Sequence, residues 1–224
     1  GLIGPNGAGK TTIFNLLTKV YQPTHGTILL NGRDIHGLNT AQINRAGIAR
    51  TFQNIRLFQN LSVEENITTA MDTQMHYNMA EGILRLPRFW REERVVHERA
   101  MELLSIFHME DLAGAKASSL PYGAQRRLEI LRALATNPSL LLLDEPAAGM
   151  NPSETAELME NIRSIRDTFK IAVLLIEHDM NLVMNICEGI AVLNFGRIIA
   201  KGSPDDIQNN PEVIEAYLGK KKEA

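Results

Sequence analysis

Short continuous apolar runs predict buried strands in the second half of the chain. Leu140–Leu143 is four consecutive leucines, and Ile171–Ile176 is six apolar residues. Runs of this length without alternation are typical of strands covered on both faces, as in parallel sheets. Two further runs, 190–194 and 197–200, flank a Phe-Gly pair and predict neighbouring strands.

Apolar residues at helical spacing predict helices between these runs. Ser62 and Glu65 form a capping box that opens one helix through about Met75. Segment 84–90, which contains Phe89 and Trp90, is expected to be a loop packed on the helices, with a partner-docking surface as the alternative. The expected helices cover about residues 12–19, 62–75, 92–107, 122–136, 153–169 with Ser153 as the cap, 180–186, and a last segment that opens at Ser203-Pro204.

The first quarter of the chain predicts a hairpin and one further strand. Asn31-Gly32 joins 28–30 to 33–35 and fits the positive φ angles of a type I′ turn. Residues 48–52 predict a strand that ends at Gln53. We therefore expect an α/β fold. Its mostly parallel sheet comes from residues 1–54 and 129–224, and a helical subdomain occupies residues 55–128.

The composition excludes some classes of function but does not indicate one. The chain has 224 residues and a net charge of −3, so no nucleic-acid or other polyanion partner is expected. The single cysteine, Cys187, cannot form an internal disulfide and suits a reducing compartment. A helix that spans a membrane needs ~20 apolar residues, far more than the longest run offers.

A glycine-rich motif near the start of the chain predicts a phosphate site. It fits G-x-x-x-x-G-K-[ST] and reads Gly4-Pro5-Asn6-Gly7-Ala8-Gly9-Lys10-Thr11, followed by Thr12. Glycines let successive N–H groups turn inward, the lysine reaches the β- and γ-phosphates, and the Thr11 hydroxyl binds Mg²⁺. A glycine-rich turn alone is often only a tight loop, but the Lys-Thr ending favours a nucleoside triphosphate. Only three residues precede the motif, so we expect the chain to be trimmed, without its earlier strands.

Polar residues at the ends of predicted strands supply the remaining chemistry. Asp144 would hold Mg²⁺, and Glu145 would polarise the attacking water, although an aspartate here can also cap the next helix. His178 follows another buried strand, so it could donate to a γ-phosphate oxygen rather than act structurally. Gln53 could complete the Mg²⁺ shell or be a surface amide.

The order of these motifs resembles the ATP-binding subunits of ABC transporters. Between Gln53 and Asp144-Glu145-Pro146 lies Leu-Pro-Tyr-Gly-Ala-Gln-Arg-Arg at 120–127, in the place of that family's signature. The segments at 121–130, 144–152 and 210–219 resemble more closely the ATPases of branched-chain amino-acid importers. The resemblance covers essentially the whole chain.

The resemblance implies a P-loop NTPase fold with a RecA-like core and a head-to-tail dimer, homo- or heteromeric. Each of two ATP molecules would touch the P-loop of one subunit and Tyr122, Gly123 and Gln125 of the other. Gln53 would bind Mg²⁺ near a contact with integral membrane permease subunits. A soluble substrate-binding protein would deliver the cargo, and the chain would lie peripherally on the cytoplasmic face of the inner or plasma membrane.

Three features depart from the general family pattern. The usual Leu-Ser-Gly-Gly-Gln has Pro121 at the serine, Tyr122 at the first glycine and Ala124 at the glutamine. Asn151 stands where most ABC families have aspartate in the loop after Asp144 and Glu145. The aromatic residue that stacks on adenine upstream of the P-loop has no counterpart, so we expect the chain as given to hold ATP poorly.

Two other classes of function stay open at this point. ABC ATPases without a membrane partner act on DNA or ribosomes, but they carry long coiled coils or two cassettes, which this chain lacks. A P-loop kinase would need an acceptor site and an arginine-bearing lid, and would not need Glu145. Branched-chain amino acids are the expected cargo from resemblance alone, with amides, urea and aromatic derivatives as alternatives.

Overall fold

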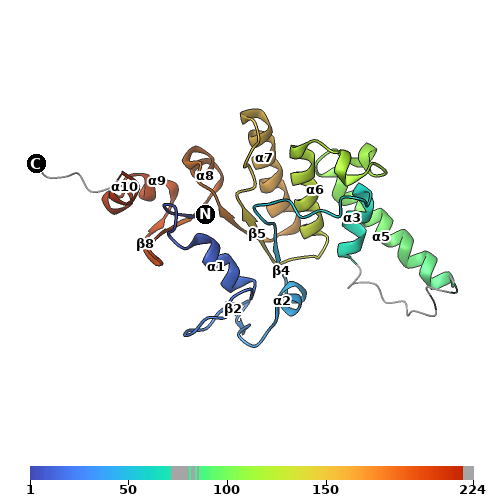
Figure 1. The fold of residues 1–224 in the computed structure, drawn as a ribbon, viewed down its shortest axis with the longest axis horizontal. Coiled ribbons are helices and arrows are strands. Elements are labelled where there is room, and N and C mark those ends of the chain that lie inside the picture. The colour runs from blue at the N-terminus through green and yellow to red at the C-terminus, as the bar shows by residue number, and fades with distance from the viewer. Residues whose placement is uncertain (72–80, 82–83, 85, 219–224) are drawn as a thin grey trace, which may run out of the picture. The chain divides into compact units, whose positions relative to one another are not determined.

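The computed structural model describes residues 1–71, 81, 84 and 86–218 (Figure 1). Contacts divide the chain into two compact units. The sheet unit comprises 1–53, 140–148 and the residues from 171 onward, and the helical unit comprises 54–139 and 149–170. The helical unit is larger than the expected insert, because 129–139 and 149–170 group with it. The assignment of separate roles to the expected subdomains stays a prediction.

The sheet unit contains a six-stranded, mostly parallel sheet in the order β4-β5-β6-β1-β7-β8 (Figure 1). Neighbouring strands from β4 to β7 pair in parallel, and only β7 and β8 pair antiparallel. The expected α/β fold with a parallel core is confirmed. The strands are β1 (Leu2–Ile3), β4 (Ile48–Arg50), β5 (Leu140–Asp144), β6 (Ala172–Ile176), β7 (Ile190–Asn194) and β8 (Arg197–Gly202).

Two apolar cores cover opposite faces of this sheet. Successive residues of a strand point to opposite faces, and Leu2 and Ile3 accordingly belong to different cores. The Leu2 core includes Phe14 and Ile43, so α1 (Lys10–Leu17) and α2 (Thr40–Ala46) pack on that face. The Ile3 core includes residues of the other three helices, which are α8 (Met180–Ile186), α9 (Pro204–Gln208) and α10 (Pro211–Leu218).

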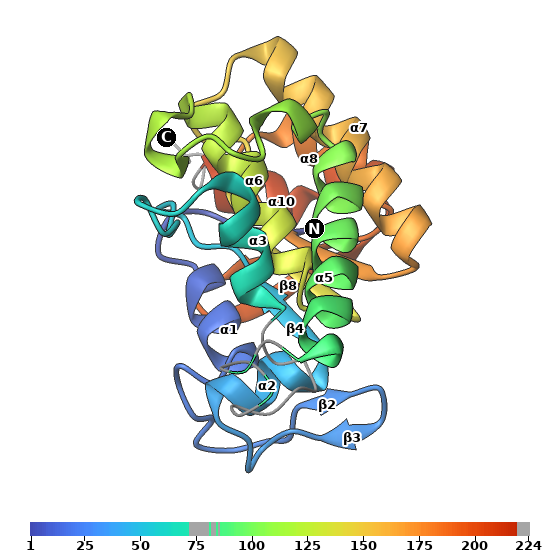
Figure 2. The same cartoon turned by 90° about the vertical axis from the view of Figure 1, so that its right-hand side faces the viewer.

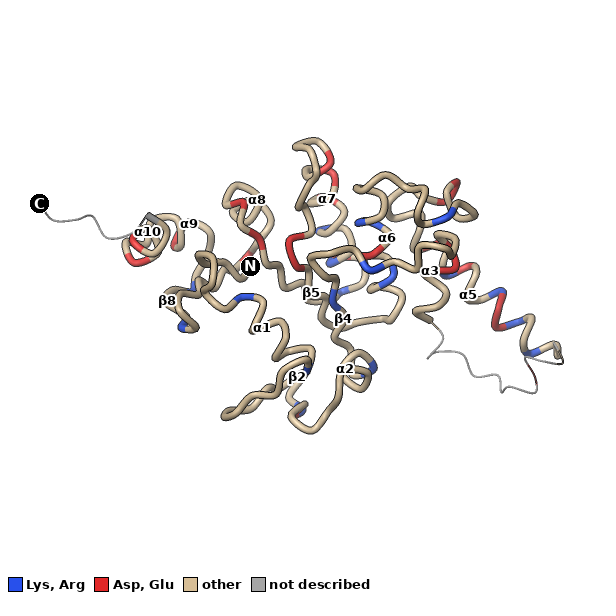
Figure 3. The backbone as a smooth tube through the Cα atoms, in the orientation of Figure 1, with Lys and Arg blue, Asp and Glu red and all other residues tan. Residues whose placement is uncertain are grey.

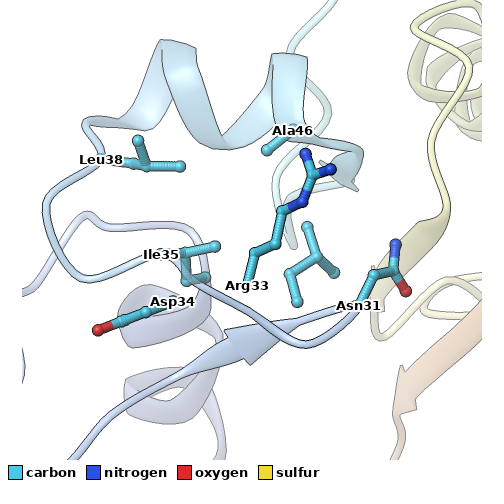
Figure 4. Close-up of a pocket in the computed structure, with 7 residues that line it drawn as sticks. Asn31, Arg33, Asp34, Ile35, Leu38 and Ala46 are labelled. Carbon is cyan, nitrogen blue, oxygen red and sulfur yellow. The ribbon is translucent and has the colours of Figure 1, made fainter.

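A two-stranded hairpin stands outside the main sheet. Strands β2 (Leu29–Leu30) and β3 (Arg33–Asp34) pair antiparallel, and Asn31 and Gly32 have φ of 49° and 77°, as the type I′ turn requires. A pocket lies between this hairpin and α2 (Figure 4). None of the predicted site residues lines it, so it is separate from the predicted chemistry.

The helical unit is built around three contacting helices, α3 (Val63–Ala70), α5 (Pro87–Ser105) and α6 (Tyr122–Leu134) (Figure 2). The predicted capping box is confirmed, since Glu65 N–H donates to the Ser62 hydroxyl and Ser62 N–H to the Glu65 carboxylate. The predicted continuation of α3 to Met75 lies outside the described residues. The other elements of this unit are the 3₁₀ turns Glu110–Leu112 and Ala117–Ser119 and the helix α7 (Pro152–Phe169).

Two sequence-based expectations about helices are wrong, and one helix was missed. Helix α5 begins at Pro87, so Phe89 and Trp90 lie in a helix, because proline is well suited to the first helical position. Helix α2 was not predicted, although Asn39 and Gln42 form a capping box at its start. The cap of α7 is Asn151 rather than Ser153, and Pro152 follows it at the first position.

None of the helices within the described residues is both long enough and apolar enough to cross a membrane.

Candidate nucleotide-binding site

Parallel pairing brings four predicted motifs to one edge of the sheet. The glycine-rich loop follows β1, Asp144 is the last residue of β5, Gln53 lies three residues beyond β4, and His178 lies two residues beyond β6. These four strands are neighbours and run in the same direction, so their carboxyl ends meet. Ligands of open α/β sheets bind at such an edge.

The loop between β1 and α1 has a backbone that glycine must supply. Gly4, Gly7 and Gly9 have φ of 153°, 77° and 104°, in the region that disfavours side chains. A Cβ on Gly4 would stand 2.0 Å from the carbonyl oxygen of Leu193, so only glycine fits there. Within the loop, Ala8 N–H donates to the Pro5 carbonyl, and the exposed Asn6 and Gly7 form its tip.

The ammonium group of Lys10 lies folded against this loop. Its Nζ donates to the carbonyl oxygens of Gly4 at 2.7 Å and Pro5 at 3.1 Å. Burial lowers the Lys10 pKa, and the negative charges of Glu145 and Asp144 oppose that shift. The charges of both predicted acids therefore act on the Lys10 ammonium group. Thr11 and Thr12 are exposed on the first turn of α1.

The two acids have different surroundings. Asp144 is buried and forms an ion pair with Arg50, with 2.9 Å between Oδ2 and Nη2. Glu145 is half-buried, has a φ of 48°, and donates its N–H to the Ile176 carbonyl at the end of β6. A non-glycine residue at positive φ is uncommon and often marks a functional turn. Asp144 is thus suited to a fixed charge, and Glu145 to contact with a ligand.

Gln53 and His178 both lie beside Glu145. The amide Nε2 of Gln53 donates to Glu145 Oε2 at 3.1 Å. Nδ1 of His178 is 3.9 Å from Glu145 Oε1, and the His178 side chain is exposed. The structure therefore gathers Gln53, Glu145 and His178 into one polar cluster.

Glu177 is a buried acid that sequence reasoning missed. Its carboxylate accepts from the N–H of Ala147 at 3.1 Å and of His178 at 3.2 Å. Burial raises the Glu177 pKa, while these two hydrogen bonds and the charge of His178 act in the opposite direction. Glu177 thus ties the loop after Glu145 to the segment that carries His178. Its position at the end of the apolar run 171–176 was the available signal.

The residues expected to contact a second nucleotide lie in the helical unit, at the start of α6. Tyr122 is its first residue and is exposed, and Gly123 is buried. A Cβ on Gly149 would stand 3.2 Å from the Tyr122 ring. The Gln125 amide Nε2 donates to the Leu120 carbonyl at 2.9 Å, so this side chain is bound to its own loop.

The available groups fit a magnesium-bound triphosphate. Thr11, Gln53 and Asp144 offer a hydroxyl, an amide and a carboxylate oxygen, which are ligand types that Mg²⁺ prefers. The glycine loop and the N-terminus of α1 offer backbone N–H groups to phosphate. Figure 3 shows acidic residues where the chain leaves β5, whereas acidic and basic residues alternate along α5.

The sequence matches the ABC transporter family over residues 1–148. It also matches a segment described as branched-chain amino acid ATP-binding cassette transporter over residues 197–223. It is 49% identical over 218 residues to the high-affinity branched-chain amino acid transport ATP-binding protein BraF of Pseudomonas aeruginosa, covering 97% of this chain and 86% of that protein. The corresponding protein LivG of Escherichia coli is 50% identical over the same lengths.

A solved structure agrees with these matches. The crystal structure of an ATP-binding cassette of an ABC transporter in its ADP conformation superimposes with a TM-score of 0.81 and 30% identity, covering 98% of this chain and 87% of that one. The chain therefore belongs to the ABC transporter family, as one of its ATP-binding and ATP-hydrolysing subunits.

Proposed function

We propose that this chain powers the import of branched-chain amino acids and that the residues at the sheet edge carry its ATP hydrolysis. The polar cluster of Gln53, Glu145 and His178 at the sheet edge is the observation that supports the catalytic part. The identity to BraF and LivG, and the match of the C-terminal segment, support the cargo.

The glycine loop binds the β- and γ-phosphates through its N–H groups, and Lys10 exchanges its two carbonyl partners for phosphate oxygens. Thr11, Gln53 and Asp144 would hold Mg²⁺. The metal, when bound, neutralises charge on the phosphate oxygens. Burial keeps the Asp144 carboxylate in a fixed place, which suits a metal ligand.

Glu145 acts as the general base that orients and polarises the attacking water. It follows β5 at the sheet edge that carries the glycine loop, and Gln53 orients its carboxylate by a hydrogen bond. His178 supports the geometry of the same water or donates to the γ-phosphate. Glu177 holds the backbone on which His178 lies.

Two such subunits form the working ATPase, as a homo- or heterodimer, and Tyr122, Gly123 and Gln125 contact the nucleotide held by the other subunit. Integral membrane permease subunits anchor the dimer at the cytoplasmic face of the membrane. A soluble binding protein delivers the amino acid to the permease. ATP closes the dimer, closure moves the permease, and hydrolysis resets it.

Reconstitution with the permease subunits and the soluble binding protein from the same genome tests the cargo. We expect leucine, isoleucine or valine on the binding protein to stimulate ATP hydrolysis in proteoliposomes. The matched control uses urea, a short-chain amide or an aromatic amino acid as the added ligand. Stimulation by one of those controls alone would reject branched-chain cargo while leaving the ATPase assignment intact.

A further inference from the structure

Arg50 joins three separate segments of the sheet unit at the edge where the predicted site lies. It is the last residue of β4, and its Nη2 donates to Asp144 Oδ2 at 2.9 Å. Its Nη1 donates to Asn15 Oδ1 at 2.7 Å, on the helix that follows the glycine loop. Its guanidinium carbon lies 5.3 Å from the ring centre of Phe14 and 5.1 Å from that of Phe52.

The strand register explains why Arg50 reaches Asp144. Arg50 pairs with Leu142, and residues two apart on a strand share a face, so Asp144 lies on the face to which Arg50 points. Phe14 packs in the same core as Leu142, which places α1 over this face. Two strands and one helix therefore converge on the guanidinium.

This arrangement leaves the guanidinium little freedom. The Arg50 and Asp144 side chains are 7% and 6% exposed, so solvent screens the pair weakly. The planar fork is held through Asn15 on one nitrogen and lies against two aromatic rings. Arg50 Nε is buried without a hydrogen-bond partner among the described residues, which costs free energy. The Arg50 side chain thus donates to Asp144 in a position where its own Nε–H has no hydrogen-bond partner among the described residues.

The residues after Arg50 continue the same pattern. The Asp144 N–H donates to the Thr51 hydroxyl at 3.4 Å, and Gln53 donates to Glu145. The chain leaving β4 therefore contacts both acids at the end of β5. Arg50 is the member of this segment that holds the Asp144 carboxylate itself.

We propose that Arg50 is a positioning residue for Asp144, which fixes the orientation of that carboxylate toward the magnesium ion of bound ATP. The inference rests on the proposed magnesium site. Groups that hydrogen-bond to a metal ligand orient it, and their mutation typically lowers metal affinity by about 10–100-fold. Arg50 acts through Asp144, so its effect belongs to the metal-dependent part of nucleotide binding.

The test compares ATP affinity with Mg²⁺ and with EDTA, by calorimetric titration of the whole chain. In the unaltered protein, Mg²⁺ tightens binding. In Arg50→Met, we expect this tightening to fall by about 10–100-fold, with the affinity in EDTA within about twofold. Arg50→Lys keeps the charge but cannot donate to Asn15 and Asp144 together, so we expect it to behave like Arg50→Met.

Arg126→Met is the matched control, because it also removes a buried arginine from a carboxylate. We expect Arg126→Met to leave the ratio of ATP affinity with Mg²⁺ to that with EDTA unchanged. If Arg50→Met does not fold, Asn15→Ala removes the anchor of the fork and should reduce the tightening in the same direction.

Each other outcome overturns something specific. The positioning role alone would be overturned if Arg50→Met left the ratio of ATP affinity with Mg²⁺ to that with EDTA unchanged, even where both affinities fall. Full rescue by Arg50→Lys would also overturn it. No tightening by Mg²⁺ in the unaltered protein would overturn the proposed metal site, and this inference with it.

Discussion

The two units each bury an arginine against a carboxylate, but the pairs differ in how the sequence supplies them. Arg126 and Glu129 are three residues apart on α6, with 2.7 Å between Nη1 and Oε2 and exposures of 0% and 2%. Arg50 and Asp144 are 94 residues apart and meet only because β4 and β5 are neighbours. The local pair secures a helix, and the long-range pair lies among groups proposed to bind a ligand.

A second pair of contacts, one in each unit, shows the same contrast. In the helical unit, the buried Asn66 bonds to Phe58 and Ser62, eight and four residues away. In the sheet unit, Gln53 bonds to Glu145 across 92 residues. Arg50, Gln53 and the two acids are thus brought from distant segments to one edge of the sheet, which is what a site for a charged ligand requires. Substitutions can separate polar groups that stabilise a helix from polar groups that are proposed to bind a ligand.

Glu145→Gln should have the largest effect. Removing the general base is expected to lower ATP turnover by about 10²–10⁴-fold, while ATP affinity stays within a few-fold. The variant should accumulate as an ATP-loaded dimer, which size-exclusion chromatography with Mg²⁺ and ATP would detect. Unchanged turnover in a steady-state phosphate-release assay would remove Glu145 from this role.

Arg126→Met should destabilise the protein without affecting chemistry at the sheet edge. It removes the hydrogen-bonded arginine from the buried Glu129 carboxylate, and breaking a buried ion pair typically costs about 3–5 kcal/mol. Urea denaturation measures the loss. The double variant Arg126→Met/Glu129→Leu should recover most of it, since apolar replacement of a whole buried pair is often neutral. A single variant as stable as the unaltered protein would contradict the structural role.

Lys10→Ala should remove nucleotide binding while the fold persists. Two charge-assisted hydrogen bonds to phosphate are lost, at roughly 1.5–3 kcal/mol each, so affinity should fall at least about a hundredfold. Titration with ATP measures the affinity, and circular dichroism checks the fold. Lys170→Ala, at the end of α7 in the helical unit, is a control that should keep the affinity. Retained affinity in Lys10→Ala would count against the phosphate site.

Asn151→Ala should have the smallest effect. Asn151 Oδ1 accepts the Glu154 N–H at 3.0 Å as the cap of α7, and loss of such a cap costs about 1 kcal/mol. Asn151→Asp restores the acceptor and should restore stability. A loss of ATPase activity in Asn151→Ala, with stability unchanged, would show that this residue serves the nucleotide rather than the helix.

Local patterns predicted most of the elements. Four leucines marked β5, Asn31-Gly32 marked the hairpin turn, and Ser62 with Glu65 marked the start of α3. The helix start at Pro87 was missed because the large apolar residues nearby suggested a packed loop.

The place of a site residue in the fold was predictable where a sequence motif defines its chemistry, as with Lys10. It was also predictable where the residue directly follows a buried strand, as with Glu145. Arg50 and Glu177 could not be assigned a contact from the sequence. Their partners depend on which strands lie side by side and in what register. Strand order is a property of the whole fold, and no local pattern encodes it.

The two-residue strand β1 has a consequence for how the protein is made. Leu2 pairs with Ile176 and Ala191, and Ile3 pairs with Val192, so the strand that leads into the glycine loop lies between two strands that are synthesised long after it. A ribosome adds about 5–20 residues per second, so these partners emerge about 10–40 s after β1. Until β6 has been made, β1 lacks both of its neighbours in the sheet, so the glycine loop that follows it cannot yet be held at the sheet edge.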